Sequence, residues 1–587
     1  MKKRLRSLVV GFLPTFILML GVQTSQAGSA TWKSNPASGD WNTATNWTPQ
    51  TIPNGPSDTA TFVSSNTTSV SLSANTEVDG IVFNPGASAF TITASPSFTI
   101  VISGIGITNS SGIRQNFVAA ADNTGNRGQI FFTNSATAGS LTTFTIAGDE
   151  VSGVPPAFME FLNTSTAANA TVINNGTAPG GVHGGETHFF DASTAGNAHL
   201  INRGSTIRNA IGGGSIFHDN STAGNATILN NTGATQGAGG GGTIFYDTST
   251  ADNATFTNKA GGGTEFAGNS SAGNGTFINN PANFRGSGGT TIFEDTATAA
   301  NATLVAMAGV GSGYGGVIRF IADATGGTSR VKLFGNGNPG RSGNGILDLS
   351  DSGPGVTVGS LEGNGVVLLQ FTGLGVGTNN LDTTFSGTIS GTSSGTSLTK
   401  VGVGTLVLTG ANTYAGGTTI WGGGKLVVNN ENGSGTGSGP VQVNAGRLGG
   451  TGTIAGAVNV GAGRGREALL SPGKSANTRG SLTIQGTLTF NSDAIYKFQL
   501  NSNTAKADNV LANGVTINSG AQFAFADVGN ATFPLGTVFT PINNTSPNLI
   551  AGTFSNLPDG GTFSSNGNTY QVSYEGGDGN DLTLTAQ

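Results

Sequence analysis

An internal repeat between Phe132 and Leu304 constrains this chain more than any other feature of its sequence. An asparagine in an Asn-Ala or Asn-Gly pair recurs there at intervals of 28, 28, 28, 21 and 27 residues. A phenylalanine stands eight residues before each marker, an alanine stands two before it, and an apolar residue follows three after it. The markers are Asn169, Asn197, Asn225, Asn253, Asn274 and Asn301, preceded by Ser140 in the same frame, and the phenylalanines are Phe132, Phe161, Phe189, Phe217, Phe245, Phe266 and Phe293. Fixed spacing at several positions at once is typical of a structural repeat.

Each repeat contains two short β-rich pieces, such as TIFYD and ATFTN, joined by Ser, Thr, Gly and Asn. One unit cannot bury its own apolar face, but it can do so when it is stacked on copies of itself. Stacked coils lie about 4.8 Å apart, so equivalent phenylalanines form an interior column whose buried rungs each contribute roughly 2–3 kcal/mol. The sequence therefore predicts an all-β fold, a parallel and right-handed β-helix or β-solenoid.

The asparagine markers are predicted to occupy tight turns, where asparagine tolerates a positive φ and its amide can bond to the next asparagine along the stack. The 21-residue unit lost seven residues between Asn258 and Phe266, while the spacing from phenylalanine to asparagine stayed intact. Length changes confined to one segment indicate loops that project from one side of a solenoid.

Composition supports a β protein and narrows its partners. Glycine accounts for 98 of the 587 residues and only 9% are charged, so the residues that favour helices are scarce. The net charge is −6 and becomes −10 without the first 27 residues, and the basic residues are scattered, so we expect no nucleic-acid partner. The chain has no cysteine, which excludes disulfides and zinc sites built on thiolates.

Residues 1–27 have the pattern of an export signal. A basic start with Lys2, Lys3, Arg4 and Arg6 precedes the apolar stretch from Leu8 to Val22, and small residues up to Ala27 suggest a cleavage site. We expect an exported protein without an integral membrane span once this segment is removed.

The segment 28–101 holds three of the four tryptophans, Trp32, Trp41 and Trp47. We favour an N-terminal β cap that covers the first coil, as solenoids require. The alternative is an aromatic platform on which surface glycans stack. The repeat zone then covers 102–310, a continuation of the solenoid covers 311–490, and a C-terminal β unit covers 491–587. Alternating runs in that last part, including IYKFQL, AQFAFADV and DLTLT, predict antiparallel strands.

A second pattern, LTKVGVGTLVLTGANTYAGGTTIWGGGKLVVNN, spans 398–430 and carries Lys400, Asn412 and Tyr414 among regularly placed glycines. This stretch resembles the autotransporter-associated β-strand repeat, also called the passenger-associated repeat, of bacterial autotransporter-like surface proteins. The resemblance implies an exported β-helix at or outside the cell surface, with a presenting or adhesin-like role and no catalytic residues. Full autotransporters end in a membrane β-barrel of many alternating strands, and the residues up to Gln587 contain too few such strands for us to expect one.

An acidic column is the best candidate for chemistry. Asp191, Asp219 and Asp247 each lie six residues before an asparagine marker. Stacked carboxylates can hold calcium, and the alternative function is accordingly a carbohydrate-active β-helix, either a polysaccharide lyase or a glycan-binding protein, that depends on calcium. A serine stands two residues after each aspartate, which instead favours Asx-type turn bonds without a ligand. His188 and His218 lie one residue before and one after the phenylalanine column, and we expect them to point differently from the sheet.

Overall fold

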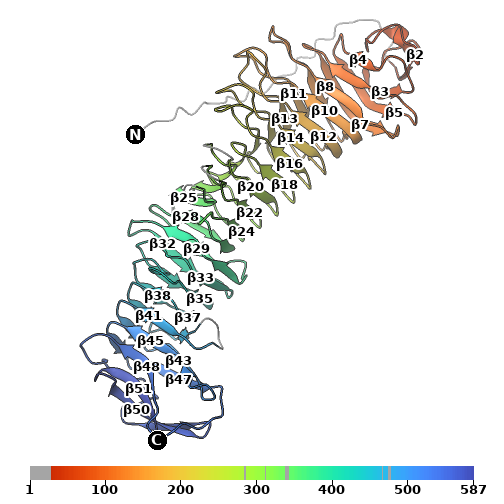
Figure 1. The fold of residues 1–587 in the computed structure, drawn as a ribbon. Coiled ribbons are helices and arrows are strands. Elements are labelled where there is room, and N and C mark those ends of the chain that lie inside the picture. Colours follow the sequence, from red (N-terminus) through yellow and green to blue (C-terminus); the bar gives the residue numbers. More distant parts are fainter. Residues whose placement is uncertain are drawn as a thin grey trace.

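The protein is a long parallel β-solenoid in the computed structural model (Figure 1). The structure describes residues 28–282, 286–310, 313–337, 343–353, 355–465, 467–473 and 478–587. The predicted export signal lies outside these described residues. Among them, no helix is long and apolar enough to cross a membrane.

Two ladders of short strands form the walls of the solenoid. In both, neighbouring strands come from successive coils and pair almost entirely in parallel. The first sheet consists of β2(Trp47–Thr48), β1(Ala30–Trp32), β3(Gly55–Phe62), β5(Thr76–Phe83), β7(Thr99–Asn109), β9(Gln129–Phe132), β11(Phe158–Phe161), β13(Glu186–Phe189), β15(Gly214–Phe217), β17(Gly242–Phe245), β19(Gly263–Phe266), β21(Thr290–Phe293), β23(Val317–Ala322), β25(Ile346–Ser352), β28(Val366–Leu368) and β31(Thr388–Ser390). The second sheet consists of β4(Ser69–Ser71), β6(Thr91–Ala94), β8(Gln115–Ala119), β10(Ser140–Ile146), β12(Asn169–Asn174), β14(His199–Asn202), β16(Thr227–Asn230), β18(Thr255–Asn258), β20(Thr276–Asn279), β22(Thr303–Ala306), β24(Arg330–Leu333), β27(Ser360–Gly363), β30(Thr383–Phe385), β33(Thr405–Leu408), β35(Gly424–Val428), β37(Gly446–Gly450), β40(Ala468–Pro472), β43(Ala494–Asn501), β47(Gln522–Asp527) and the short β44(Lys506–Ala507).

Two further sheets complete the C-terminal half. The third sheet consists of β26(Val356–Val358), β29(Gly373–Val376), β32(Ser397–Lys400), β34(Thr418–Ile420), β36(Val441–Val443), β39(Val458–Val460), β42(Leu488–Phe490) and β46(Val515–Ile517). The C-terminal sheet consists of β38(Thr453–Ile454), β41(Ser481–Ile484), β45(Asn509–Ala512), β48(Val538–Asn544), β51(Asp581–Ala586), β50(Asn568–Gly576) and β49(Thr562–Ser565). A single 3-10 turn, η1(Ala44–Asn46), lies in the described N-terminal segment.

The predicted phenylalanine column is confirmed. The rings from Phe132 to Phe293 are fully buried, and Phe320 of β23 extends the column by one coil. Adjacent rings lie 4.6–5.0 Å apart between centroids and are tilted by only 4–14°. Alternate side chains of every first-sheet strand point into the core. Equivalent residues of successive coils therefore lie on top of one another as long as the strand register is kept.

The shortened repeat keeps this register. β17 pairs with β19 across the 21-residue unit, and Phe245 stacks on Phe266 at 4.7 Å. The missing residues come from the loop between a second-sheet strand and the next first-sheet strand, as the sequence predicted.

The repeat zone and the later zone form one continuous object. β23 pairs with β21 on one side and β25 on the other, and β24 likewise joins β22 to β27. In the repeat zone the third side of each coil is a single bridged residue, such as Thr222 bridged to Thr250. A Cβ at Gly326 would touch the carbonyl of Thr357, so the third sheet continues that bridge column.

The predicted turn conformation at the asparagine markers is wrong by one residue. A positive φ occurs at the residue before the marker, for example 50° at Ala168, 51° at Asp252 and 45° at Ala300. The strand begins at the marker in β12 and two residues after it in the later coils, and the marker's amide does form the predicted bond along the stack. Each marker donates Nδ2 to Oδ1 of the preceding one at 3.1–3.3 Å.

The C-terminal unit is only partly antiparallel. β48, β51, β50 and β49 pair antiparallel in that order, but β43 and β47 pair parallel to each other. The expectation of antiparallel strands from IYKFQL and AQFAFADV is therefore wrong, because alternation shows which face is buried and not the direction of the partner strand.

Candidate functional site

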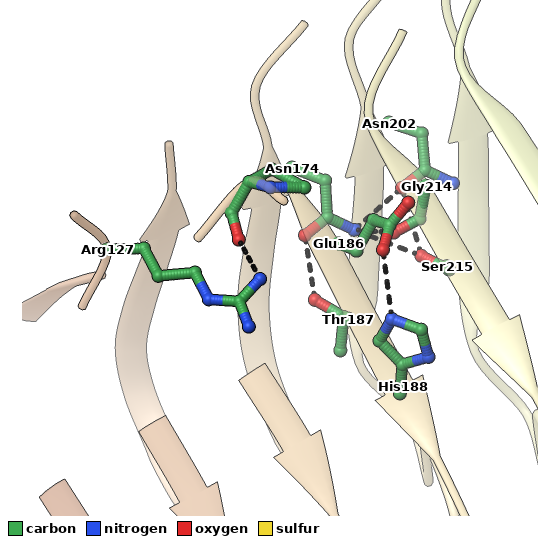
Figure 2. Close-up of polar contacts among 9 residues, drawn as sticks. Arg127, Asn174, Glu186, Thr187, His188, Asn202, Gly214 and Ser215 are labelled. Atoms are coloured by element: carbon green, nitrogen blue, oxygen red, sulfur yellow. Dashed lines mark hydrogen bonds and ion pairs between the residues drawn. The ribbon is translucent and has the colours of Figure 1, made fainter. Parts of the chain in front are cut away.

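A buried polar ladder runs beside the phenylalanine column. It contains Asn174, Asn202, Asn230, Asn258 and Asn279, all fully buried at the ends of second-sheet strands. Over the four steps of the ladder, Nδ2 of each asparagine donates to Oδ1 of the next at 2.8 Å, and also to a backbone carbonyl of the first sheet. A Ser or Thr hydroxyl donates to each Oδ1, as Figure 2 shows for Thr187 and Ser215. The ladder joins the two sheets through the core, so its role is structural.

A cluster of charged groups lies on the outer face of the first sheet (Figure 2). Glu186 and His188 alternate with the inward Thr187 on β13, and their side chains meet at 3.1 Å. Arg127 lies over the ring of Phe158 at 4.8 Å. Burial lowers the pKa of Arg127, and the charges of Glu160 and Glu186 oppose that shift. Burial also raises the pKa of Glu160, against the charges of His188 and Arg127.

A ladder of stacked rings continues along this face. His218 lies 4.5 Å from Phe190, 5.4 Å from Tyr246 and 5.8 Å from His188, all nearly parallel. The expectation that His188 and His218 point differently is wrong, because positions one before and one after an inward residue share the outer face. Burial, with the nearby charge of His188, lowers the pKa of His218 to about 4.

Two carboxyl groups meet further along the same face. Burial raises the pKa of Glu265 to about 7, and a hydrogen bond with Glu294 and its charge add to the shift. A hydrogen bond between two carboxyl groups requires that one of them holds a proton, and such a pair needs no ligand to explain its raised pKa.

The aspartate column is bonded along the stack. Asp191, Asp219 and Asp247 have φ values of 55°, 52° and 55°. Oδ2 of Asp219 accepts the backbone N–H of Asp191 at 3.0 Å, and Oδ2 of Asp247 accepts that of Asp219 at 3.0 Å. The predicted Asx bond to the serine two residues on does not explain the column, since the carboxylates instead cap the turn of the preceding coil. In the described ranges, no three His, Asp or Glu side chains are arranged to hold a metal ion.

The three N-terminal tryptophans are packed inside the first coils. Trp32, Trp41 and Trp47 are fully buried and cluster around Phe62, with centroid distances of 5.6–6.0 Å to that ring. Their indole N–H groups donate to the carbonyls of Thr67, Pro53 and Trp41. This burial contradicts the aromatic-platform alternative, because no indole face is open to a sugar.

Polar residues of the 398–430 stretch form hydrogen bonds both between coils and within their own coil. Asn412 accepts the N–H of Ile389 at 2.8 Å and donates to the carbonyl of Gly435 at 2.6 Å, so it links three coils. The buried Lys400 donates to the carbonyls of Val401 and Gly402, and burial lowers its pKa to about 8. The hydroxyl of the buried Tyr414 lies 2.6 Å from that of Thr418. The hydrogen bonds of these groups stabilise the fold.

A groove of about 570 Å³ lies on the outer face of the second sheet, and unlike the ladders above it is open to solvent. It crosses β24, β27, β30 and β33, and Lys332, Phe334, Glu362, Asp382 and Thr384 are among the residues that line it. Here charged groups and an exposed ring face an open concavity. Sequence inspection missed this groove because its residues come from four coils without a shared repeat.

Residues 398–428 match the family model described as Passenger-associated-transport-repeat. Together with the parallel β-solenoid, this match confirms the resemblance to passenger-associated repeat proteins. The crystal structure of the Haemophilus influenzae Hap adhesin is similar to this chain at 9% sequence identity with a TM-score of 0.27, and the likeness covers 90% of this chain and 64% of that one. The chain thus spans less than two thirds of the Hap adhesin chain, and a TM-score of this size supports no inference. The comparison with curated proteins gave no match.

Proposed function

We propose that this chain is a non-enzymatic, exported β-helix that acts at or outside the cell surface in an adhesin-like role. The observation that carries the proposal is that the repeated side chains of the described coils serve to hold neighbouring coils together. The columns of apolar rings, asparagines and aspartates stack on one another or bond between coils. These contacts hold the coils together as one long rod. The passenger-repeat match at 398–428 supports export.

The rod shape suits presentation. Loops of different length project between second-sheet and first-sheet strands, and Figure 1 shows them along one side of an elongated body. A solenoid tolerates changes in such loops because each coil contacts mainly its neighbours. Surface glycans or other cell-surface components are the partners that this role implies.

Fractionation of the producing cells tests the proposal. We expect the chain in the medium, or on intact cells where added protease removes it. Recovery only from the cytoplasm, with none accessible to protease, would contradict a surface role. In a second arm, beads coated with the purified chain should attach to host or bacterial cells more than beads coated with an unrelated β-solenoid.

A further inference from the structure

We propose that the exposed asparagine markers of the repeat zone are acceptor sites for N-linked glycans, so that the exported chain carries a row of sugars along one side of the solenoid. Five of the six asparagine markers have a threonine two residues later and no proline between, which is the acceptor pattern Asn-X-Thr. They are Asn169, Asn225, Asn253, Asn274 and Asn301. This inference rests on the proposed export and deepens the surface role by naming a modification and its sites.

The backbone presents each acceptor pair to solvent. In β12, Ala170 is fully buried between Asn169 and Thr171. Side chains alternate along a strand, so this asparagine and this threonine share the outer face of the second sheet. In the other four coils the residue between the pair is likewise buried and the asparagine is exposed. A sugar attached to any of the five asparagines would therefore extend away from the sheet.

The hydrogen bonds of the marker ladder leave one N–H of each amide for a sugar. Nδ2 of Asn225 donates to Oδ1 of Asn197 at 3.2 Å, and an asparagine amide carries two N–H groups. Glycosylation replaces only one of these hydrogens, so the bond along the stack can persist. Because successive coils lie about 4.8 Å apart, we expect neighbouring sites to be occupied only in part on any one molecule.

Asn230 shows why exposure matters. It also has a threonine two residues later, so it fits the same acceptor pattern. Its side chain is fully buried, however, and its Nδ2 donates both to Asn258 Oδ1 and to the carbonyl of Gly263. A sugar on Asn230 would disrupt the inner ladder and the core, so we expect none there on the folded chain.

Asn197 is a control that the sequence itself supplies. It belongs to the same ladder, is exposed, and donates to Oδ1 of Asn169 at 3.3 Å. The residue two positions later is His199 and not threonine, so the hydroxyl of the acceptor pattern is missing. We therefore expect Asn197 to stay unmodified in the middle of a glycosylated row.

The reaction needs a glycosyl diphosphate as donor, carried on a nucleotide or on a lipid. Nδ2 of the asparagine bonds to C1 of the sugar, the bond from C1 to the phosphate oxygen breaks, the diphosphate leaves with the electron pair, and one Nδ2 proton passes to a base of the transferase. β16 is paired with β14 on one side and β18 on the other, which prevents its acceptor segment from entering an active site in the finished solenoid. Transfer therefore precedes the folding of each coil.

Peptide mapping by mass spectrometry, on the chain isolated from the producing cells, tests the proposal. Fragmentation that keeps the sugar on its residue should place glycans on the five asparagines and leave Asn197 and Asn230 bare. Thr227→Val keeps a β-branched side chain on β16 and should abolish the glycan at Asn225 alone. His199→Thr should create a new glycan at Asn197. Neither substitution should change stability in urea, because both positions face outward at the second-sheet surface.

Three results would each overturn the proposal: five bare asparagines in the exported chain, equal modification of Asn197, or a glycan at Asn225 that survives Thr227→Val. A variant without residues 1–27 identifies the donor. A glycan on this retained chain indicates a nucleotide-linked donor inside the cell, and its loss indicates a lipid-linked donor on the far side of the membrane. An exported chain with bare asparagines would refute glycosylation only, because fractionation tests the surface role separately.

Discussion

Replacing Asn230 with alanine should be one of the more damaging single substitutions in the repeat zone, although the residue is polar. Its Nδ2 donates to Oδ1 of Asn258 and to the carbonyl of Gly263, both at 2.8 Å. Its Oδ1 accepts from Nδ2 of Asn202 at 2.8 Å and from the hydroxyl of Thr243 at 3.0 Å. The side chain is fully buried, so water cannot replace these bonds in the intact fold.

The magnitude follows from the groups left without a partner. Asn202 still donates to Gly242, and Asn258 Oδ1 still accepts from Thr264. The carbonyl of Gly263 and the hydroxyl of Thr243 lose the amide that satisfies them. At about 1–3 kcal/mol for each orphaned buried group, the variant should lose about 2–6 kcal/mol.

Asn253→Ala provides the matched comparison. Asn253 belongs to the exposed marker ladder and bonds Asn225 at 3.3 Å and Asn274 at 3.1 Å, with water available to replace both partners. We expect a cost of about 0.5–1 kcal/mol. Solenoids open locally, so amide hydrogen exchange in β14, β16 and β18 is the suitable assay, with urea unfolding as a second measure. An Asn230→Ala variant that costs no more than Asn253→Ala would refute the claim that the inner ladder stabilises the core.

Three further predictions concern other parts of the solenoid. Gly417→Ala should cost about 1–3 kcal/mol in urea unfolding, because φ is 98° and the new Cβ would lie 2.5 Å from a carbonyl of the next coil, whereas Gly422→Ala, with 3.7 Å of space, should cost less. The pKa of Glu265 is raised from 4.5 to about 7 by burial and by Glu294, so the folded state binds more protons and stability should fall as the pH rises through this window. The free energy of unfolding of Glu265→Gln, relative to that of the parent, should therefore rise by about 1–2 kcal/mol between pH 5 and pH 8, since partial access to water reduces the full effect. A stability difference between the two proteins that does not change with pH would contradict this. Asp219→Asn should change stability by less than about 0.5 kcal/mol, because an amide oxygen can accept the same backbone N–H, and a rise in Tm on adding calcium in the parent but not in this variant would revive the calcium hypothesis.

The periodic part of the fold could be predicted from the sequence. Phe217 and Phe245 recur in register, and a parallel stack is the arrangement that buries such a column. The inner asparagines were equally periodic, since Asn202 and Asn230 each stand five residues after a marker. They escaped notice because asparagine is usually a turn residue, and burial with complete hydrogen bonding depends on partners in three strands.

Features that depend on pairing between unlike coils could not be predicted. The groove lined by Lys332, Thr384 and Val407 draws its residues from separate coils, and bringing them together requires the strand register. The positive φ at Ala168 rather than at Asn169 depends on how the turn is bonded to the adjacent coil. The tryptophan cluster illustrates the same limit, because composition placed Trp41 at the solenoid end but only packing decided that its ring is inaccessible.

An experimental structure of residues 28–587 tests the central claim most directly, through the side chains of Phe189, Phe217 and Phe245. Stacking of like residues from successive coils predicts parallel rings inside the solenoid, with centroids 4.6 Å apart. Rings that point apart, or that face solvent, would contradict the account.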